Sequence, residues 1–174
     1  CTVTVDNMTG EKGSTINMSV CLNNGDLSIL GFQCDIEYPE GALAGEPETT
    51  NRAPKHTIDT SDESKNPITY MLVSLKNLSF SGTSGALFTV PITLNMAPGQ
   101  YKITIKNIRC TLSDFTEVAV EATEATLTVT LPAVPNEFIV TDAVKADDAL
   151  ADNEIAKNDD GGWHARTINL VDGY

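Results

Sequence analysis

Two stretches of sequence decide the fold: Leu27–Gly41, LSILGFQCDIEYPEG, and Gly82–Ile108, GTSGALFTVPITLNMAPGQYKITIKNI. In both, apolar and polar residues alternate with a period of two, and glycine or a proline-glycine pair interrupts the alternation. That alternation is typical of strands with one buried and one solvated face, and the interruptions are typical of turns. The two stretches therefore predict antiparallel β-strands.

The same pattern extends over the first 131 residues and predicts about nine short strands without a helix, as in a sandwich or jelly roll. Pro91 lies inside an expected strand and has no N–H for the ladder, so we expect a bulge or a local gap in pairing there. After Asn107 the alternation slips by one residue, which predicts a β-bulge. The residues expected to face inward in three strands are Phe32, Cys34 and Ile36; Phe88, Val90, Ile92 and Leu94; and Tyr101, Ile103, Ile105, Ile108, Cys110 and Leu112.

The composition changes at Pro132, where PAVP, residues 132–135, has the character of a linker. Beyond it we expect strands over 137–142 and 163–171, with a short helix over 142–150 as the alternative. The chain is therefore divided into a sandwich, residues 1–131, and a segment, residues 132–174. That segment is interpreted as a linker with extra strands or the beginning of a following domain, and we expect both chain ends to be cuts from a longer protein.

The charge of the chain excludes some classes of partner. Its 174 residues include 24 Asp and Glu against 11 Lys and Arg, which gives a net charge of −13. A field of that sign repels phosphate backbones and anionic lipid, so neither nucleic-acid binding nor membrane docking is expected. Because no run of 18 apolar residues occurs, membrane insertion is not expected either. We interpret the acidity as solubility on an extracellular surface.

The four cysteines, at positions 1, 21, 34 and 110, leave alternatives open. They contain no Cys-x-x-Cys pair, which argues against a zinc cluster. A hairpin centred near Glu11 would bring Cys1 opposite the Cys21 region, and a bridge between the two sheets from Cys34 to Cys110 is compatible with their inward positions. In the alternative all four are free and act as small apolar residues. A lipid-anchored Cys1 is less favoured, because such a residue usually precedes a flexible linker.

Three motifs in order, Gly31–Gly41, Leu72–Leu87 and Pro98–Ile108, resemble the cohesin-like domains of multidomain surface and secreted proteins of Bacteroidales. The resemblance covers residues 1 to about 131, and the closing residues 168–174 resemble a segment found downstream of such domains. It implies an all-β, two-sheet jelly-roll sandwich, similar also to carbohydrate-binding modules. It further implies a non-catalytic module without a cofactor, in an extracellular or bacterial cell-surface protein.

The resemblance also implies a protein partner, dockerin-like, that binds one face of a sheet. In this chain the corresponding outer face would present Gln33, Asp35 and Glu37, together with the outward residues of 68–75 and 87–93. Such sites work by shape, with an apolar centre and a hydrogen-bonding rim.

Two other functions compete with protein recognition. A carbohydrate-binding module would stack sugar rings on exposed aromatic side chains, for which Tyr38 and Tyr70 are the candidates, with Trp163 in the C-terminal segment. Tyr101 has an inward position, so a strip of three aromatic residues is not visible in the sequence. A structural spacer in the stalk of an adhesin would show neither an apolar patch nor a groove.

Catalytic and metal motifs are weak. Ser84 and His56 could belong to a serine triad, but the GTSG around Ser84 is not the Gly-x-Ser-x-Gly elbow and is typical of a turn. The oxygen-rich stretches 59–63 and 158–160 lack the ligand spacing of an EF-hand. His164, like His56, lies in a polar segment. We therefore predict no enzyme activity, metal or cofactor.

Overall fold

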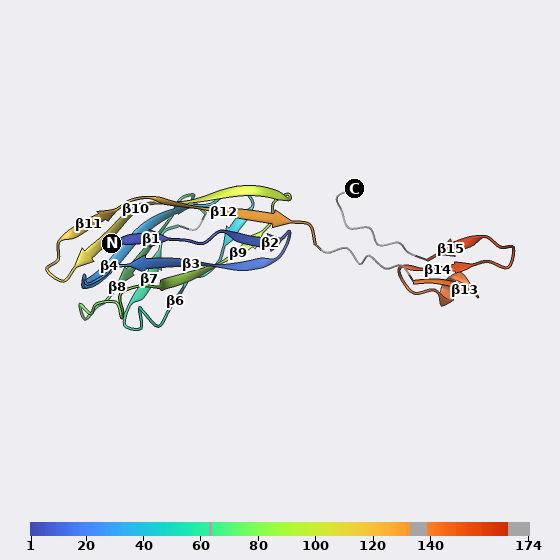
Figure 1. Ribbon diagram of the computed structural model, residues 1–174, viewed down its shortest axis with the longest axis horizontal. Helices are drawn as coiled ribbons and strands as arrows, with labels where there is room; N and C mark the ends of the chain where they lie inside the picture. Colours follow the sequence, from blue (N-terminus) through green and yellow to red (C-terminus); the bar gives the residue numbers. More distant parts are fainter. Residues whose placement is uncertain (63, 133–138, 167–174) are drawn as a thin grey trace. The chain divides into compact units, whose positions relative to one another are not determined.

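The computed structural model describes residues 1–62, 64–132 and 139–166, and it divides into two compact units, Cys1–Thr130 and Leu131–Tyr174 (Figure 1). Strands hold 55% of the chain and helices 2%, so the expected all-β, two-sheet sandwich is confirmed. Most of the expected linker, and the part of the last expected strand beyond residue 166, lie outside the described residues.

The first unit is a sandwich of two sheets. We call the five-stranded one sheet A and the seven-stranded one sheet B. The order in sheet A is β1 (Thr2–Thr4), β3 (Thr15–Asn23), β9 (Ala86–Leu94) and β5 (Ala42–Ala44), and β6 (Glu48–Thr49) also pairs with β9. The order in sheet B is β2 (Met8–Glu11), β12 (Thr123–Thr130), β10 (Gly99–Leu112), β4 (Ile29–Glu37), β8 (Ile68–Val73) and β7 (Thr57–Thr60), and β11 (Glu117–Val120) also pairs with β10.

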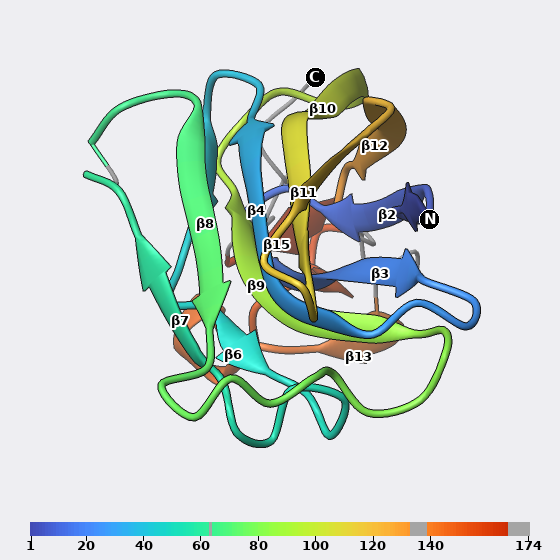
Figure 2. The same ribbon diagram turned by 90° about the vertical axis from the view of Figure 1, so that its left-hand side faces the viewer.

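The N-terminal segment closes one edge of the sandwich because it belongs to both sheets. Its first part, β1, pairs antiparallel with β3 of sheet A, and its second part, β2, pairs parallel with β12 of sheet B. The remaining strand pairs of the sandwich are antiparallel. Figure 2 shows β8, β4 and β10 side by side.

The core lies between the sheets and is filled by the inward-facing side chains that alternate along the strands of both sheets. Phe32, Cys34 and Ile36 of β4 are buried, as are Phe88 and the other expected inward residues of β9. Tyr70 of β8 stacks on Phe88 with ring centroids 5.4 Å apart, which joins sheet B to sheet A. Because successive residues of a strand point to opposite faces, burial of these side chains also fixes which residues face solvent.

Both expected irregularities are present. Pro91 lies where the outer neighbour of β9 is interrupted between β5 and β6, and its carbonyl accepts a hydrogen bond from the Gly45 N–H at 2.7 Å. The missing N–H of Pro91 therefore falls at a local gap in pairing. In β10 the register against β4 shifts between Lys106 and Arg109, and Asn107 has a φ of 51°, so the predicted bulge is confirmed.

The cysteines differ from the expected pairings. Thr4 pairs with Cys21, so the N-terminal strand runs beside β3, but Cys1 lies three residues away from the position opposite Cys21. Cys34 and Cys110, however, lie on neighbouring strands of the same sheet, so the expectation of a bridge between sheets from one to the other was wrong. Inward position on two strands does not place them on opposite sheets. All four cysteines are free in this structure.

The second unit holds a small sheet of its own. β13 (Ile139–Val144) pairs parallel with β14 (Glu154–Lys157), which pairs antiparallel with β15 (Trp163–Ala165). Only a 3₁₀ turn, Asp147–Ala149, forms within the region of the alternative helix. Across the described residues, no helix is long and apolar enough to cross a membrane.

Arg52 connects three segments at one end of the sandwich. Its guanidinium uses all five N–H donors: they reach the carbonyls of Leu22, Ser81, Gly82 and Gly85 and the side-chain oxygen of Asn24, at 2.6–3.1 Å. These acceptors belong to the end of β3 and to the loop between β8 and β9. One side chain therefore adds five hydrogen bonds to the few backbone bonds that join these irregular segments.

We predict that Arg52→Ala lowers the free energy of unfolding by about 2–3 kcal/mol, because several carbonyls lose a charged donor at once. Arg52→Lys should recover less than half of that loss, since a lysine cannot reproduce the planar fork. Urea denaturation measures the effect, and Lys55→Ala, an exposed cation in the same loop, is the control. Equal stabilities of the alanine variants at positions 52 and 55 would contradict the role of Arg52.

His56 belongs to the packing of the sandwich. Its ring is buried and stacks on Phe80 with centroids 4.1 Å apart, and Nε2 lies 3.0 Å from the Leu30 carbonyl oxygen. A carbonyl oxygen only accepts, so Nε2 carries the hydrogen. Burial lowers the pKa of His56 below its usual value of 6.5, and the bond to Leu30 offsets part of that effect.

The lowered pKa of His56 predicts a pH-dependent stability. Below pH 6.5 the His56 side chain becomes protonated in the unfolded chain. In the folded protein it stays neutral until the pH falls to its own, lower pKa. The His56 contribution should therefore be intact above about pH 7.5 and decline as the pH falls below 6.5, by at most about 1.4 kcal/mol per pH unit. Unfolding curves of the wild type and of His56→Asn between pH 5 and 8 measure it. Parallel pH profiles of the two proteins would contradict the assignment.

Candidate binding face

The outer face of sheet B carries the residues that the sequence placed there. Gln33, Asp35 and Glu37 of β4 point outward, since they alternate with buried residues. The register aligns the outward residues of neighbouring strands in rows across the sheet. The rows are Thr57, Val73, Gly31 and Thr111; Asp59, Met71, Gln33 and Arg109; Thr69, Asp35 and Lys106; and Glu37 with Thr104.

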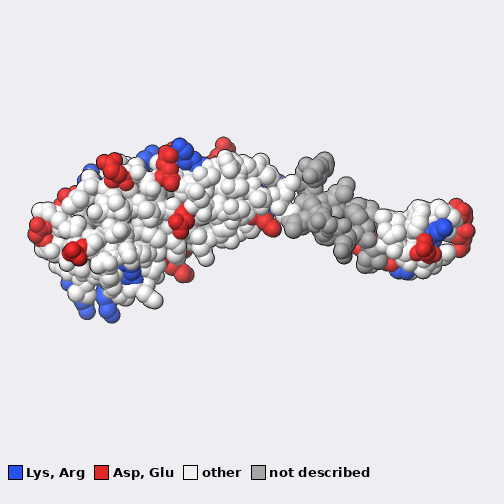
Figure 3. Space-filling view, viewed as in Figure 1, with Lys and Arg blue, Asp and Glu red and all other residues white. Residues whose placement is uncertain are grey.

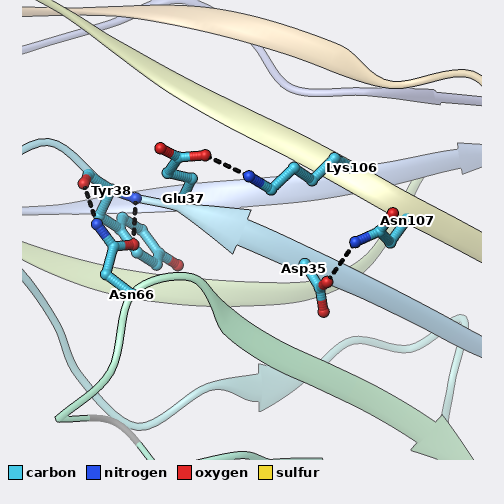
Figure 4. Close-up of polar contacts among 6 residues, drawn as sticks. All are labelled: Asp35, Glu37, Tyr38, Asn66, Lys106 and Asn107. Atoms are coloured by element: carbon cyan, nitrogen blue, oxygen red, sulfur yellow. Dashed lines mark hydrogen bonds and ion pairs between the residues drawn. The ribbon is translucent and has the colours of Figure 1, made fainter.

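Asp35 is held by two neighbours on this face. Its carboxylate accepts hydrogen bonds from Asn107 Nδ2 on β10 and from Thr69 Oγ1 on β8, both at 2.7 Å. Figure 4 shows Asn107 reaching Asp35 from the bulge in β10. The backbone of the bulge thus orients the side-chain amide of Asn107 toward β4. The carboxylate has a fixed orientation while it remains partly exposed to a partner.

The charges along β10 are matched by acids on adjacent strands. Lys106 Nζ lies 2.5 Å from Glu37 Oε2 (Figure 4), and two further pairs join Lys102 to Glu124 of β12 and Arg109 to Glu117 of β11. Such exposed pairs each contribute only about 0–1 kcal/mol to stability. Figure 3 shows acidic side chains dispersed over the visible face of the sandwich, with basic ones beside several of them. The surface along β10 therefore carries paired charges of both signs and is not a single acidic field, despite the net charge of the chain.

The expectation that Tyr38 and Tyr70 are exposed was wrong. Both are buried, and their hydroxyl groups lie 2.9 Å apart. Tyr70 shares the inward phase of Ile68 and Leu72. Burial raises the pKa of Tyr38, and its backbone N–H and carbonyl are both bonded to the side chain of Asn66 (Figure 4). The two tyrosines stabilise the interior and offer no ring face to a ligand.

The expectation that residues 87–93 share this face was also wrong. They lie in β9, which belongs to sheet A. The neighbours of β4 in sheet B are β8 and β10. Sequence periodicity shows which residues of a strand point outward, but long-range pairing decides which sheet the strand joins. The outward residues of β10, Lys106 and Arg109 among them, take the place expected for β9.

An apolar groove lies at one end of the face. Its volume is about 220 Å³, and it is lined by Leu30, Gly31, Val73, Ser74, Asn77, Thr111 and Phe115. A second hollow of about 130 Å³ shares Gly31, Val73 and Thr111 with it and extends to Met71 and Arg109. Gly31 forms the floor because it has no side chain in a row of outward residues. The groove therefore lies on the same face as the polar rows and borders the row of Met71, Gln33 and Arg109.

Phe115 stands at this groove in a strained conformation. Its φ is 65°, a left-handed value that is a genuine outlier for a bulky residue, and the residue is 65% exposed. The turn between β10 and β11 holds it there: Asp114 accepts hydrogen bonds from the N–H and hydroxyl of Thr116, and the Phe115 N–H donates to Leu112. Such strain costs on the order of 1–3 kcal/mol and is found preferentially at functional sites.

Sequence reasoning missed Gly31 and Phe115 as members of a site, whereas Met71 is one of the outward residues of 68–75 that were expected on this face. A lone phenylalanine in the polar turn Ser113–Thr116 was the signal that could have drawn attention to position 115. Elsewhere, the described residues contain no group of three or more His, Cys, Asp or Glu side chains arranged to hold a metal ion.

No protein-family model matches the sequence, and no curated protein matches it by sequence. Solved structures do resemble it. A non-cellulosomal cohesin from the hyperthermophilic archaeon Archaeoglobus fulgidus has a TM-score of 0.61 at 18% identity, covering 75% of this chain and 92% of its own. The cohesin module of a family 33 glycoside hydrolase from Clostridium perfringens has a TM-score of 0.65 at 15% identity, covering 75% and 96%.

A third similar structure is a type I cohesin–dockerin complex from Clostridium thermocellum, with a TM-score of 0.63 at 16% identity, covering 74% of this chain and 98% of that one. Identities this low establish the architecture alone. The sandwich of this chain therefore has the jelly-roll fold of cohesin modules.

Proposed function

We propose that the sandwich is a non-catalytic protein-recognition module, which binds a dockerin-like partner through the outer face of sheet B. The observation that carries the proposal is the groove over Gly31, bordered by the exposed Met71 and Phe115, on the same face as the fixed carboxylate of Asp35. An apolar centre beside satisfied polar groups is the composition of a recognition interface.

The two ends of the face contribute to binding in different ways. At the groove, an apolar side chain of the partner packs over Gly31 between Val73 and Phe115 and is removed from water. At the polar end, Asp35 and Lys106 are already oriented by neighbours, so binding orders few further side chains. Preorganisation of this kind reduces the entropy lost on association.

Four of the similar structures are complexes in which a cohesin module binds a dockerin, and they support the partner class proposed for this chain. The setting that we propose follows instead from the resemblance of the three sequence motifs: a multidomain extracellular or cell-surface protein of a Bacteroidales-type bacterium. The acidic composition of the chain suits an exposed, soluble module.

The two competing functions have less support. A carbohydrate-binding module needed Tyr38 and Tyr70 on the surface, and both are buried. Trp163 is exposed, but it belongs to the second compact unit. A spacer was expected to have neither an apolar patch nor a groove, whereas the outer face of sheet B has both.

The test of the function is a pull-down with the immobilised 174-residue chain against the secreted proteins of its own organism, with a glycan array beside it. We expect a dockerin-bearing protein on the beads and no glycan signal. Binding of glycans without a protein would replace the proposal with a carbohydrate-binding function, and silence in both assays would favour the spacer.

At the groove, we predict that Met71→Lys and Phe115→Gly each weaken partner binding at least 30-fold, a loss of about 2 kcal/mol typical of central interface residues. Phe115→Gly should be at least as stable as the wild type, because glycine relieves the left-handed strain. Titration by calorimetry and thermal unfolding measure the two properties. The matched control is Leu43→Lys, an apolar residue on sheet A whose exposure of 57% lies between those of Met71 and Phe115, and comparable loss in that variant would contradict the face assignment.

At the polar end, we predict that Asp35→Lys and Glu37→Lys weaken partner binding while the melting temperature changes little. Asp35→Lys should have the larger effect, because it also releases Asn107 and Thr69 from their acceptor. Glu37 is half exposed and loses only its pair with Lys106. Unaltered affinity in both variants would refute the assignment of this end of the face.

A further inference from the structure

The sulfur atoms of Cys1 and Cys110 lie 3.7 Å apart, although 109 positions separate them in the sequence. Cys1 immediately precedes β1 at the edge of sheet A, and Cys110 belongs to β10 in sheet B. We propose that these two residues form a disulfide bond that fastens the N-terminal edge of sheet A to sheet B. This inference is independent of the proposed binding function.

The distance leaves a small movement to be made. The two sulfurs of a disulfide are about 2.0 Å apart, so they must approach by somewhat less than two ångströms. Cys110 is fully buried and fixed by its neighbours in the core, whereas Cys1 is exposed and precedes the first strand. Rotation of the Cys1 side chain and adjustment of its own backbone can close the gap without disturbing the core.

Geometry disfavours the two pairings that the sequence had left open, Cys34 with Cys110 and Cys1 with Cys21. Cys110 is registered with Phe32, so Cys34 is its diagonal neighbour, and diagonal Cα atoms in a sheet are about 7–8 Å apart. Disulfide-bonded Cα atoms are usually about 4.4–6.8 Å apart. Cys21 is registered with Thr4, three residues beyond Cys1, which displaces the two cysteines by about 10 Å along the strands.

The same arrangement decides which thiol reacts first. Burial raises the pKa of Cys110 to about 11, so it carries little thiolate at neutral pH and is out of reach of dissolved oxidants. The exposed Cys1 thiolate attacks a small-molecule disulfide such as oxidised glutathione, which forms a mixed disulfide and releases one glutathione thiolate. Cys110 then gives up its proton and attacks the Cys1 sulfur, and the second glutathione leaves. The protein loses two hydrogens, and one oxidised glutathione becomes two reduced ones.

The test oxidises the purified 174-residue chain with oxidised glutathione and digests it with trypsin without reduction. Cleavage after Lys12, Arg52, Arg109 and Lys145 leaves Cys1 in peptide 1–12, Cys110 in peptide 110–145, and Cys21 with Cys34 in peptide 13–52. We expect peptide 1–12 linked to peptide 110–145 in the mass spectrum, and two thiols remaining for a thiol reagent in the unfolded protein. A link from peptide 13–52 to either of the others, or four remaining thiols, would overturn the proposal.

Stability supplies a second readout. A bridge that closes a loop of this length restricts the unfolded chain, and we expect the oxidised protein to melt about 10 °C above the reduced one. Cys1→Ser, which changes only an exposed residue, should abolish the difference, and Cys21→Ser should keep it. An oxidation-dependent shift that persists in Cys1→Ser would also refute the assignment.

Discussion

The bulge at Asn107 is the constraint on which both the core and the outer face of sheet B depend. β10 is the longest strand of the sandwich and lies between β12 and β4. With a strict period of two, Ile108 would point into solvent and Arg109 into the core, since a slip of one residue reverses every side chain. The extra residue restores the phase, and asparagine tolerates the left-handed φ that it requires. The side-chain amide of Asn107 donates a hydrogen bond to Asp35. The bulge that keeps Ile108 in the core therefore also orients the polar end of the face.

The outer face of sheet B is rigid because the other side of the same strands is packed in the core. Inward residues of β4 and β8 are packed against sheet A, which leaves their outward neighbours little freedom to change position. Gly31 is instructive here. A Cβ atom at this position would come no nearer than 3.4 Å to the Leu72 carbonyl and to Thr111, an ordinary contact, and its φ is not left-handed. Packing therefore does not require glycine at position 31, and its consequence is an open groove.

The period-two pattern predicted the strands, the bulge and the outward positions of Gln33, Asp35 and Glu37, because all of these are local properties of a half-buried strand. It could not assign β9 to a sheet or find the partner of Cys110, because both follow from pairings across long separations. The errors at Tyr38 and Tyr70 have another cause. A tyrosine is compatible with either environment, and the hydrogen bond between the two hydroxyl groups makes burial acceptable for both.

Three features that are unfavourable for the stability of the fold lie together at the groove. A glycine in a strand forfeits side-chain packing, Met71 exposes apolar surface, and Phe115 holds a left-handed backbone. Each is unfavourable by itself, and the core of the sandwich needs none of them. When residues that break local rules cluster at one place in an otherwise consistent structure, function is the explanation to test first. The neighbouring charges of β10 are already paired within the protein. Shape and apolar contact at this groove, more than net charge, are therefore expected to decide what the face binds.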